Sequence, residues 1–301
     1  MKQTFKTYRA VALMLAVILL LSVGLTYLTG GFTIGTTKGK AVLATTYPVY
    51  VAAQNILGED TSVTLHRLDG AAAGCLHDYQ LSPSDRRLTQ EADLILMNGA
   101  GAESFLHGIV EEKKCVDTSA GIDLLCADHD HDHAAGEHHH EETNEHLWLS
   151  PVRYAKQVAA VRDALCGLNP DKAAEYKKNA TAYLAKISAI AGELPDLSGK
   201  PCVLFHDSMS YLAADLGLDV KLTLSVEGES GLSAAHLGQV EALAAQYPDL
   251  LLLYDTQYAL RYEGVAGTPV SIHTAVQEDW LTAMGENVKN LKKIAKGGET
   301  P

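Results

Sequence analysis

Histidine is concentrated in one short stretch of this chain. Residues 128–146 read DHDHDHAAGEHHHEETNEH and hold more than half of the thirteen histidines. Large apolar side chains are almost absent, so the stretch offers little surface to offset the entropy of ordering it. Neutral imidazole is a common ligand of Zn²⁺, and neighbouring carboxylates attract cations. A solvated acidic loop is the alternative. The pattern predicts an accessory metal loop over residues 128–145, with these candidate ligands: His129, His131, His133, His138, His139 and His140.

Three further histidines occupy similar local settings. His77 lies in GCLHDYQLSPSD, after an expected strand and before a helix start. His146 lies in NEHLWLSP, and His206 lies in VLFHDSMSYL at the end of a hydrophobic run. In open α/β sheets, ligands bind beyond the carboxyl ends of the strands. Because these histidines are spread over both halves of a chain with a His-rich insertion, they favour one shared metal site.

The expected elements alternate between strand and helix. Apolar runs typical of strands cover residues 41–46, 62–68, 93–98, 114–117, 202–205, 221–224, 250–254 and 269–272, and 124–125 suggests a further short strand. Helical patterns cover residues 49–57, 82–91, 210–216, 233–246 and 279–294. This alternation predicts an α/β fold with parallel sheets. Two long helical stretches, 150–168 and 171–194, separate the two runs of alternation.

The pattern predicts the following domain organisation. Residues 1–29 form a signal peptide or an N-terminal membrane anchor, because Lys2, Lys6 and Arg9 precede a long apolar run. Residues 30–40 form a linker, 41–168 an N-terminal α/β lobe that includes the His-rich loop, 169–198 a linking helix and 199–295 a C-terminal α/β lobe. Either use of the N-terminal segment places the protein outside the cytoplasm, in the periplasm or anchored at the cell surface.

Charge and cysteine content narrow the function classes. The net charge is −13, from 24 Lys and Arg against 37 Asp and Glu. This balance argues against nucleic acid as a partner, since phosphates require a basic surface. The five cysteines of an exported chain permit two disulfides with one left over, and their pairing is open: Cys75, Cys115, Cys126, Cys166 and Cys202. They form no CxxC pattern, so a thiolate zinc site is not expected.

At these residues the chain resembles a known family. LDGAAAGCLHDYQLSPSD, EADLILMNGAGAESFL, HLWLSP, VLFHDSMSYLAADLGL and SVEGESGLSAAHLGQVEAL occur in the order and spacing of the metal-binding solute receptors of bacterial ABC transporters. The likeness is to the zinc-uptake branch, which carries a His-rich loop, and it covers nearly all of residues 41–293. No single motif is decisive, but their order and spacing together are specific.

The resemblance implies a fold, a cargo and a partner. The implied fold is α/β, with two lobes of mostly parallel sheets joined by one long rigid helix and the metal site in the interlobe cleft. The implied ligands are His77, His146 and His206, the cargo is Zn²⁺, and the partner is the permease of a metal-uptake ABC transporter. Two features depart from the family. Cys75-Leu76 precede His77, where a small polar residue or Pro is usual, so Cys75 is either bridged to Cys126 or a thiol near the metal.

The fourth ligand is the second departure. Manganese members and some zinc members of the family use an Asp late in the chain, where this sequence reads VSIHTAV. His273 is therefore the expected fourth ligand, and Asp255 is a weaker candidate. Nitrogen ligands suit zinc and carboxylates suit manganese, so this set favours Zn²⁺.

Two other function classes remain open from sequence. A zinc hydrolase would use the same three histidines for a catalytic metal, with Asp207 or Glu227 as base. The chain has neither an HExxH motif nor a Gly-x-Ser-x-Gly elbow, which argues against this class. A metal-binding surface adhesin of the same fold is the third reading. Stoichiometric metal binding without turnover of substrate distinguishes the receptor from the enzyme.

Overall fold

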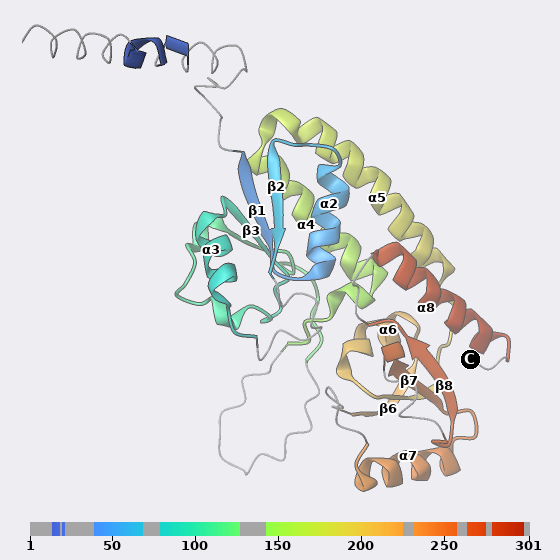
Figure 1. Ribbon diagram of the computed structural model, residues 1–301. Helices are drawn as coiled ribbons and strands as arrows, with labels where there is room; N and C mark the ends of the chain where they lie inside the picture. Colours follow the sequence, from blue (N-terminus) through green and yellow to red (C-terminus); the bar gives the residue numbers. More distant parts are fainter. Residues whose placement is uncertain are drawn as a thin grey trace, which may run out of the picture. The chain divides into compact units, whose positions relative to one another are not determined.

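The computed structural model (Figure 1) describes residues 14–18, 20–21, 39–68, 79–126, 143–224, 232–257, 264–274 and 279–297. Its first lobe is built on a sheet of four parallel strands in the order β2-β1-β3-β4. These strands are β1 (Lys40–Ala44), β2 (Val63–Arg67), β3 (Leu94–Met97) and β4 (Cys115–Asp117). The helices α2 (Tyr47–Leu57) and α3 (Pro83–Glu91) connect consecutive strands. The two central strands, β1 and β3, are largely apolar and mostly buried, as expected when helices cover both faces of a parallel sheet.

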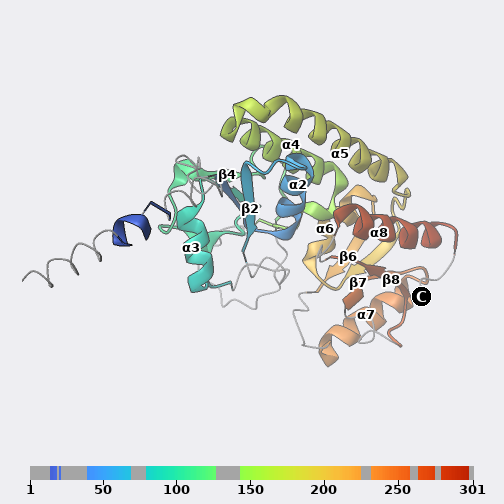
Figure 2. The same ribbon diagram turned by 45° about the horizontal axis from the view of Figure 1, so that its top comes forward.

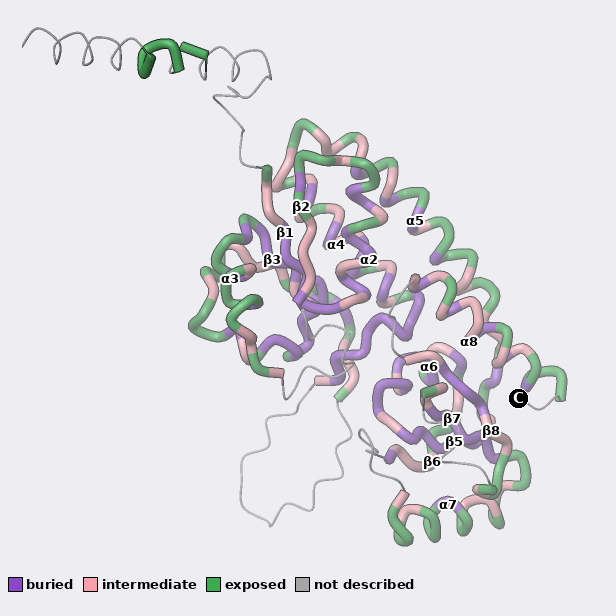
Figure 3. Tube along the Cα trace, in the orientation of Figure 1, coloured by how far each residue is buried: buried purple, intermediate pink, exposed green. Residues whose placement is uncertain are grey.

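The second lobe repeats this design. Its strands are β5 (Pro201–Leu204), β6 (Asp219–Thr223), β7 (Leu251–Asp255) and β8 (Thr268–Ile272), all parallel and in the order β6-β5-β7-β8. The helices that follow them are α6 (Ser210–Asp215), α7 (Ala234–Gln246) and α8 (Trp280–Ala295). Figure 3 shows that α7 is largely exposed, and Val240 is its one buried residue. In contrast, β5 is buried along its whole length.

Two long helices lie between the two sheets in the sequence. Helix α4 (Pro151–Leu168) begins where the Ser150 hydroxyl accepts a hydrogen bond from the Arg153 amide, with proline at the first turn. Helix α5 (Ala173–Glu193) follows after a 3₁₀ turn at Pro170–Lys172. The two helices run side by side in both views (Figures 1 and 2). Helix α5 packs against α2 in the first lobe and against α8 in the second.

The main hydrophobic core contains residues of both sheets. It includes Val42 and Leu94 of the first sheet, and Cys202 and Leu253 of the second. The ring of Tyr154 on α4 stacks on Trp280 of α8, with centroids 4.5 Å apart. The indole nitrogen of Trp280 donates to the Trp148 carbonyl at 2.8 Å. Apolar packing therefore continues from one lobe through the long helices into the other.

The fold class predicted from sequence is confirmed. The chain has two parallel-sheet α/β lobes, and the helix expected at 171–194 is α5. The short strand expected at residues 124–125 is wrong, because these residues belong to no strand and Cys126 forms only an isolated bridge with Thr143. Helix α2 begins at Tyr47, two residues before the expected start at 49, because Pro48 fits the first turn of a helix. The domain boundaries stay a prediction.

The N-terminal segment and the cysteines are the other features for which the sequence gives expectations. Within the described residues, no helix combines the length and the apolar character that crossing a bilayer requires. The signal or anchor expected over residues 1–29 falls mostly outside them and stays a prediction. The described cysteines are all free thiols, so no disulfide joins any two of this set: Cys115, Cys126, Cys166 and Cys202. Cys75 lies outside the described residues, and the bridge suggested between it and Cys126 has no support, since Cys126 is free.

Candidate metal site

The carboxyl ends of the second sheet carry polar residues from three neighbouring strands. His206 follows β5 after one intervening residue, Asp255 ends β7, and His273 follows β8 directly. The strands β5, β7 and β8 are adjacent in the sheet, so these residues leave it at the same edge. This edge is where open α/β sheets bind ligands.

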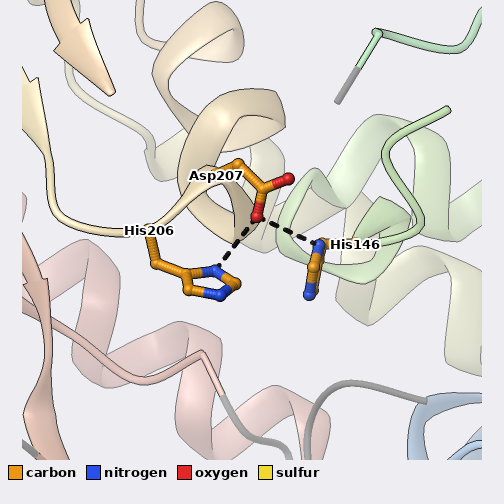
Figure 4. A group of neighbouring side chains, drawn as sticks. All are labelled: His146, His206 and Asp207. Carbon is orange, nitrogen blue, oxygen red and sulfur yellow. Dashed lines mark ion pairs between the residues drawn. The ribbon is translucent and has the colours of Figure 1, made fainter. Parts of the chain in front are cut away.

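His146 reaches the same region from the segment between β4 and α4. It precedes the 3₁₀ turn Leu147–Leu149 and is 5% exposed. Its ring and that of His206 meet edge to face, with centroids 5.6 Å apart. Figure 4 shows Asp207 between the two imidazoles, with its Oδ1 atom 3.1 Å from Nδ1 of His206 and 4.0 Å from Nδ1 of His146. The potential ligand atoms of these three residues all lie within 4.8 Å of one another.

The ring of His146 is oriented by Asn144. The Asn144 Oδ1 atom accepts the backbone N–H of His146 at 2.9 Å and lies 3.2 Å from the ring Nδ1 atom. The tautomer with its proton on Nδ1 donates to this oxygen and leaves Nε2 with a free lone pair, as a metal-binding imidazole requires. The side-chain amide nitrogen of Asn144 donates to the backbone carbonyl of Asp207 at 2.8 Å. The Asn144 side chain therefore contacts both His146 and Asp207, which come from different lobes.

His206 is held by the turn that follows it. Its Nδ1 atom lies 3.1 Å from both the Ser208 amide nitrogen and the Asp207 carboxylate. The neutral ring accepts from the amide, and the protonated ring donates to the carboxylate. Asp207 is only 5% exposed, so its charge acts in a poorly solvated setting. Two imidazoles and a buried carboxylate form a donor set that suits a divalent cation such as Zn²⁺.

Glu103, a buried carboxylate of the first lobe, supports the segment of His146 through Asn98. Glu103 accepts hydrogen bonds from the Thr45 hydroxyl and from the amides of Asn98 and Gly99. The Asn98 side chain in turn donates to the Glu145 carbonyl at 2.9 Å, next to His146. Burial raises the pKa of Glu103 from its ordinary value of 4.5 to about 7, against the lowering effect of these hydrogen bonds.

His273 and Asp255 lie beside the cluster. The backbone N–H and C=O groups of His273 are both bonded to the side chain of Asn287. Among the described residues, no ligand atom of His273 joins the cluster of His146, His206 and Asp207. Burial raises the pKa of Asp255, while the nearby charges of His206 and His273 lower it. The segment that carries His273 is hydrogen-bonded to the segment that carries His146, because the Trp148 indole nitrogen donates to the Thr274 carbonyl at 2.9 Å.

The structure thus brings together two of the four histidines expected as ligands. His146 and His206 meet; His77, Glu227 and the histidines of residues 129–140 lie outside the described residues. From the sequence, Asp207 is expected only as the base of a hydrolase, whereas the structure places it among the potential ligands. The sequence predicts no role for Asn144 or Glu103. A buried-strand end followed by Asn and Glu, as in MNGAGAE, was the one sequence signal for the latter.

The chain is similar to known metal-binding proteins. The zinc-binding lipoprotein AdcA of Streptococcus pneumoniae is 29% identical over 283 residues, which cover 85% of this chain and 56% of AdcA. The chain therefore spans about half the length of this relative. The solved Zn(II)-bound ZnuA-like domain of the same species' AdcA aligns with a TM-score of 0.68 at 24% identity, over 85% of this chain and 99% of the domain.

A further solved structure has the same fold. The solute-binding protein FpvC of Pseudomonas aeruginosa, in complex with Mn²⁺, aligns with a TM-score of 0.70 at 20% identity, over 87% of this chain and all of FpvC. Residues 42–294 match the family model described as ZnuA, the periplasmic component A of the zinc-uptake complex. Since this match covers most of the sequence, the chain belongs to the ZnuA family.

Proposed function

We propose that this protein is an extracytoplasmic solute-binding protein that captures Zn²⁺ and delivers it to the permease of an ABC importer. The observation that carries the proposal is the cluster of His146, His206 and Asp207. Its members come from both lobes, His146 from the segment before α4 and the other two from the turn after β5. A cation bound by this set is held by two lobes at once, which suits capture and later release.

The donor set supports zinc as the cargo. Ligands of a tetrahedral zinc with bonds of about 2.0 Å lie about 3.3 Å apart. The cluster atoms lie within 4.8 Å of one another, so shifts of about an ångström in two side chains would bring them to bonding distance. We propose that His77 and His273 complete a four-histidine site with His146 and His206, with the Asp207 carboxylate beside the two imidazoles rather than as a fifth ligand. Such a set favours zinc over manganese. The name of AdcA as a zinc-binding lipoprotein supports the same cargo.

The other parts of the chain fit this role. We propose that residues 41–168 and 199–295 form the two lobes and 169–198 the linking helix. Residues 1–29 direct the protein out of the cytoplasm, as a cleaved signal or as an anchor. Residues 128–145 form an accessory loop that collects metal near the site, because Cys126 and Thr143 form a bridge just before His146.

Metal binding and turnover distinguish this function from a hydrolase of the same donor set. Protein purified without chelator is dialysed against Zn²⁺, and bound zinc is counted before and after deletion of residues 128–140. The same samples are assayed for hydrolysis of ester, peptide and phosphate substrates. One tight zinc in the deleted protein, with no turnover, is the expected result. Turnover that depends on zinc, or no tight zinc at all, contradicts the proposal.

A further inference from the structure

Described residues on either side of positions 127–142 pair with each other just before His146. Cys126 and Thr143 form an antiparallel bridge, and the backbone N–H of Asn144 donates to the Leu125 carbonyl at 2.8 Å. Two residues beyond Asn144 comes His146. The position of the paired residues 125–126 and 143–144 therefore decides where the His146 ring lies relative to the second lobe.

A tyrosine of the second lobe contacts both sides of this pairing. The hydroxyl of Tyr211 on α6 accepts the Leu125 amide at 3.1 Å and donates to the Asn144 carbonyl at 2.8 Å. Tyr211 lies one helical turn after the His206–Asp207 turn and is fully buried. Its hydroxyl thus joins Leu125 and Asn144 to the element that carries the other half of the cluster.

The orientation of the tyrosine ring is itself fixed. The guanidinium carbon of Arg153 lies 4.7 Å from the ring centroid. Arg153 also pairs with Asp215 on the same helix as the tyrosine, with an N···O distance of 3.0 Å. Asp215 further accepts the Ser150 hydroxyl at 2.6 Å. The Arg153 guanidinium thus lies over the Tyr211 ring and is paired with an aspartate of the same helix. These contacts leave the Tyr211 hydroxyl little freedom to move.

We propose that Tyr211 is a positioning residue for the metal site, and that it sets the separation of His146 from His206 and Asp207 through Asn144. Its hydroxyl holds the Asn144 backbone, and the Asn144 side chain contacts His146 and the Asp207 carbonyl. Loss of the hydroxyl leaves an amide and a carbonyl without their partner in a poorly solvated place. The paired residues must then shift to find new partners, and His146 shifts with them. This inference rests on the proposed zinc site.

The test compares two tyrosines that make the same kind of contact. Tyr211→Phe removes the hydroxyl described above. Tyr176→Phe is the matched control, because the fully buried Tyr176 accepts from the Asn169 side chain and donates to Asp60, and none of these belongs to the cluster. The full-length proteins are compared by zinc affinity in competition with a chromophoric chelator, by the visible spectrum of bound Co²⁺, and by the Tm of the metal-free form.

Tyr211→Phe is expected to weaken zinc binding about tenfold or more, the usual cost of losing an outer partner of a metal ligand, and to change the Co²⁺ spectrum. Tyr176→Phe is expected to lower Tm alone. Wild-type zinc affinity and Co²⁺ spectrum in Tyr211→Phe, or equal weakening in the control, overturns the inference. If wild-type protein binds no zinc, the proposed function itself fails, which is a separate result.

A second variant decides the matter if Tyr211→Phe does not fold. Asn144→Ala keeps the backbone carbonyl that Tyr211 holds and removes the side-chain contacts to His146 and Asp207. It is expected to weaken zinc binding about as much as the loss of the hydroxyl. Unchanged zinc affinity in Asn144→Ala breaks the route from Tyr211 to the site and overturns the inference.

Discussion

His146 and His206 face each other edge to face, with ring centroids 5.6 Å apart and an angle of 88° between their planes. They follow elements of different sheets, yet their rings meet beside the same carboxylate, Asp207. Contact of this kind between two lobes is what a receptor needs when it binds a cation between them.

Removal of either ring is expected to abolish tight zinc binding. A direct ligand contributes more than an outer partner, so His146→Ala and His206→Ala should each weaken zinc affinity by more than about 100-fold. His107→Ala is the matched control, since His107 is exposed and outside the cluster. Titration calorimetry gives the three affinities. Weakening of the control to the same degree would show that the effect is unspecific.

Deletion of the His-rich segment should separate two classes of bound metal. Without residues 128–140, the protein is expected to bind fewer ions but to keep one tight site, because His146 and His206 are held by the lobes. Equilibrium dialysis with metal analysis counts the ions. If the deletion removes every tight ion, the accessory role of the segment is wrong.

Local signals made much of the fold predictable. Ser82 and Pro83 predict a helix start, and the Ser82 hydroxyl indeed accepts the Asp85 amide. The buried run at 93–98 predicts a parallel strand, which is β3. Such features depend on neighbours in the sequence, so they can be read from it. The suggested strand at 124–125 did not form, and the backbone amide of Leu125 instead donates to a distant partner, the Tyr211 hydroxyl.

The site was predictable only in part, for the same reason. The end of the His-rich stretch pointed to His146 and a strand end pointed to His206, and the structure brings the two together. Nothing in the sequence shows that the Asp207 carboxylate lies between both rings, since this depends on a contact between segments far apart in the chain. The support of His146 by Asn144, and of Glu145 by Asn98, also arises only in the folded protein.

His273 is a separate prediction, because it does not belong to the described cluster. If it swings in to complete an imidazole-rich site, His273→Ala weakens zinc binding as the loss of one ligand does. His273→Asp should then shift relative affinity toward Mn²⁺, since carboxylates suit manganese. Competition titrations with both ions measure the shift. Zinc affinity that is unchanged in His273→Ala removes this residue from the ligand set.

Glu103 should make the metal-free protein less stable as pH rises. Burial raises its pKa from 4.5 to about 7, so between these values the folded protein keeps a proton that the unfolded chain has lost. The free energy of unfolding therefore falls through this window, by on the order of 3 kcal/mol from this group. Urea unfolding at pH 5 to 8 measures the slope.

Glu103→Gln should flatten that slope. At pH 5 the variant is expected to be less stable than wild type, because the side-chain NH₂ group faces the Gly99 N–H and two donors cannot bond each other. This difference in the free energy of unfolding should shrink toward pH 8. Glu111→Gln is the control, since nearby lysines lower the pKa of that exposed carboxylate. A wild-type slope in Glu103→Gln would show that other groups cause the pH dependence.

Competition between Zn²⁺ and Mn²⁺ tests the central claim most directly. Protein lacking residues 128–140 is purified without chelator, analysed for bound metal, and then titrated with each ion in the presence of the other. An imidazole-rich site between the lobes predicts one bound zinc per chain that excess Mn²⁺ does not displace. Binding of Mn²⁺ in preference to Zn²⁺, or the absence of any tight metal, would contradict the account.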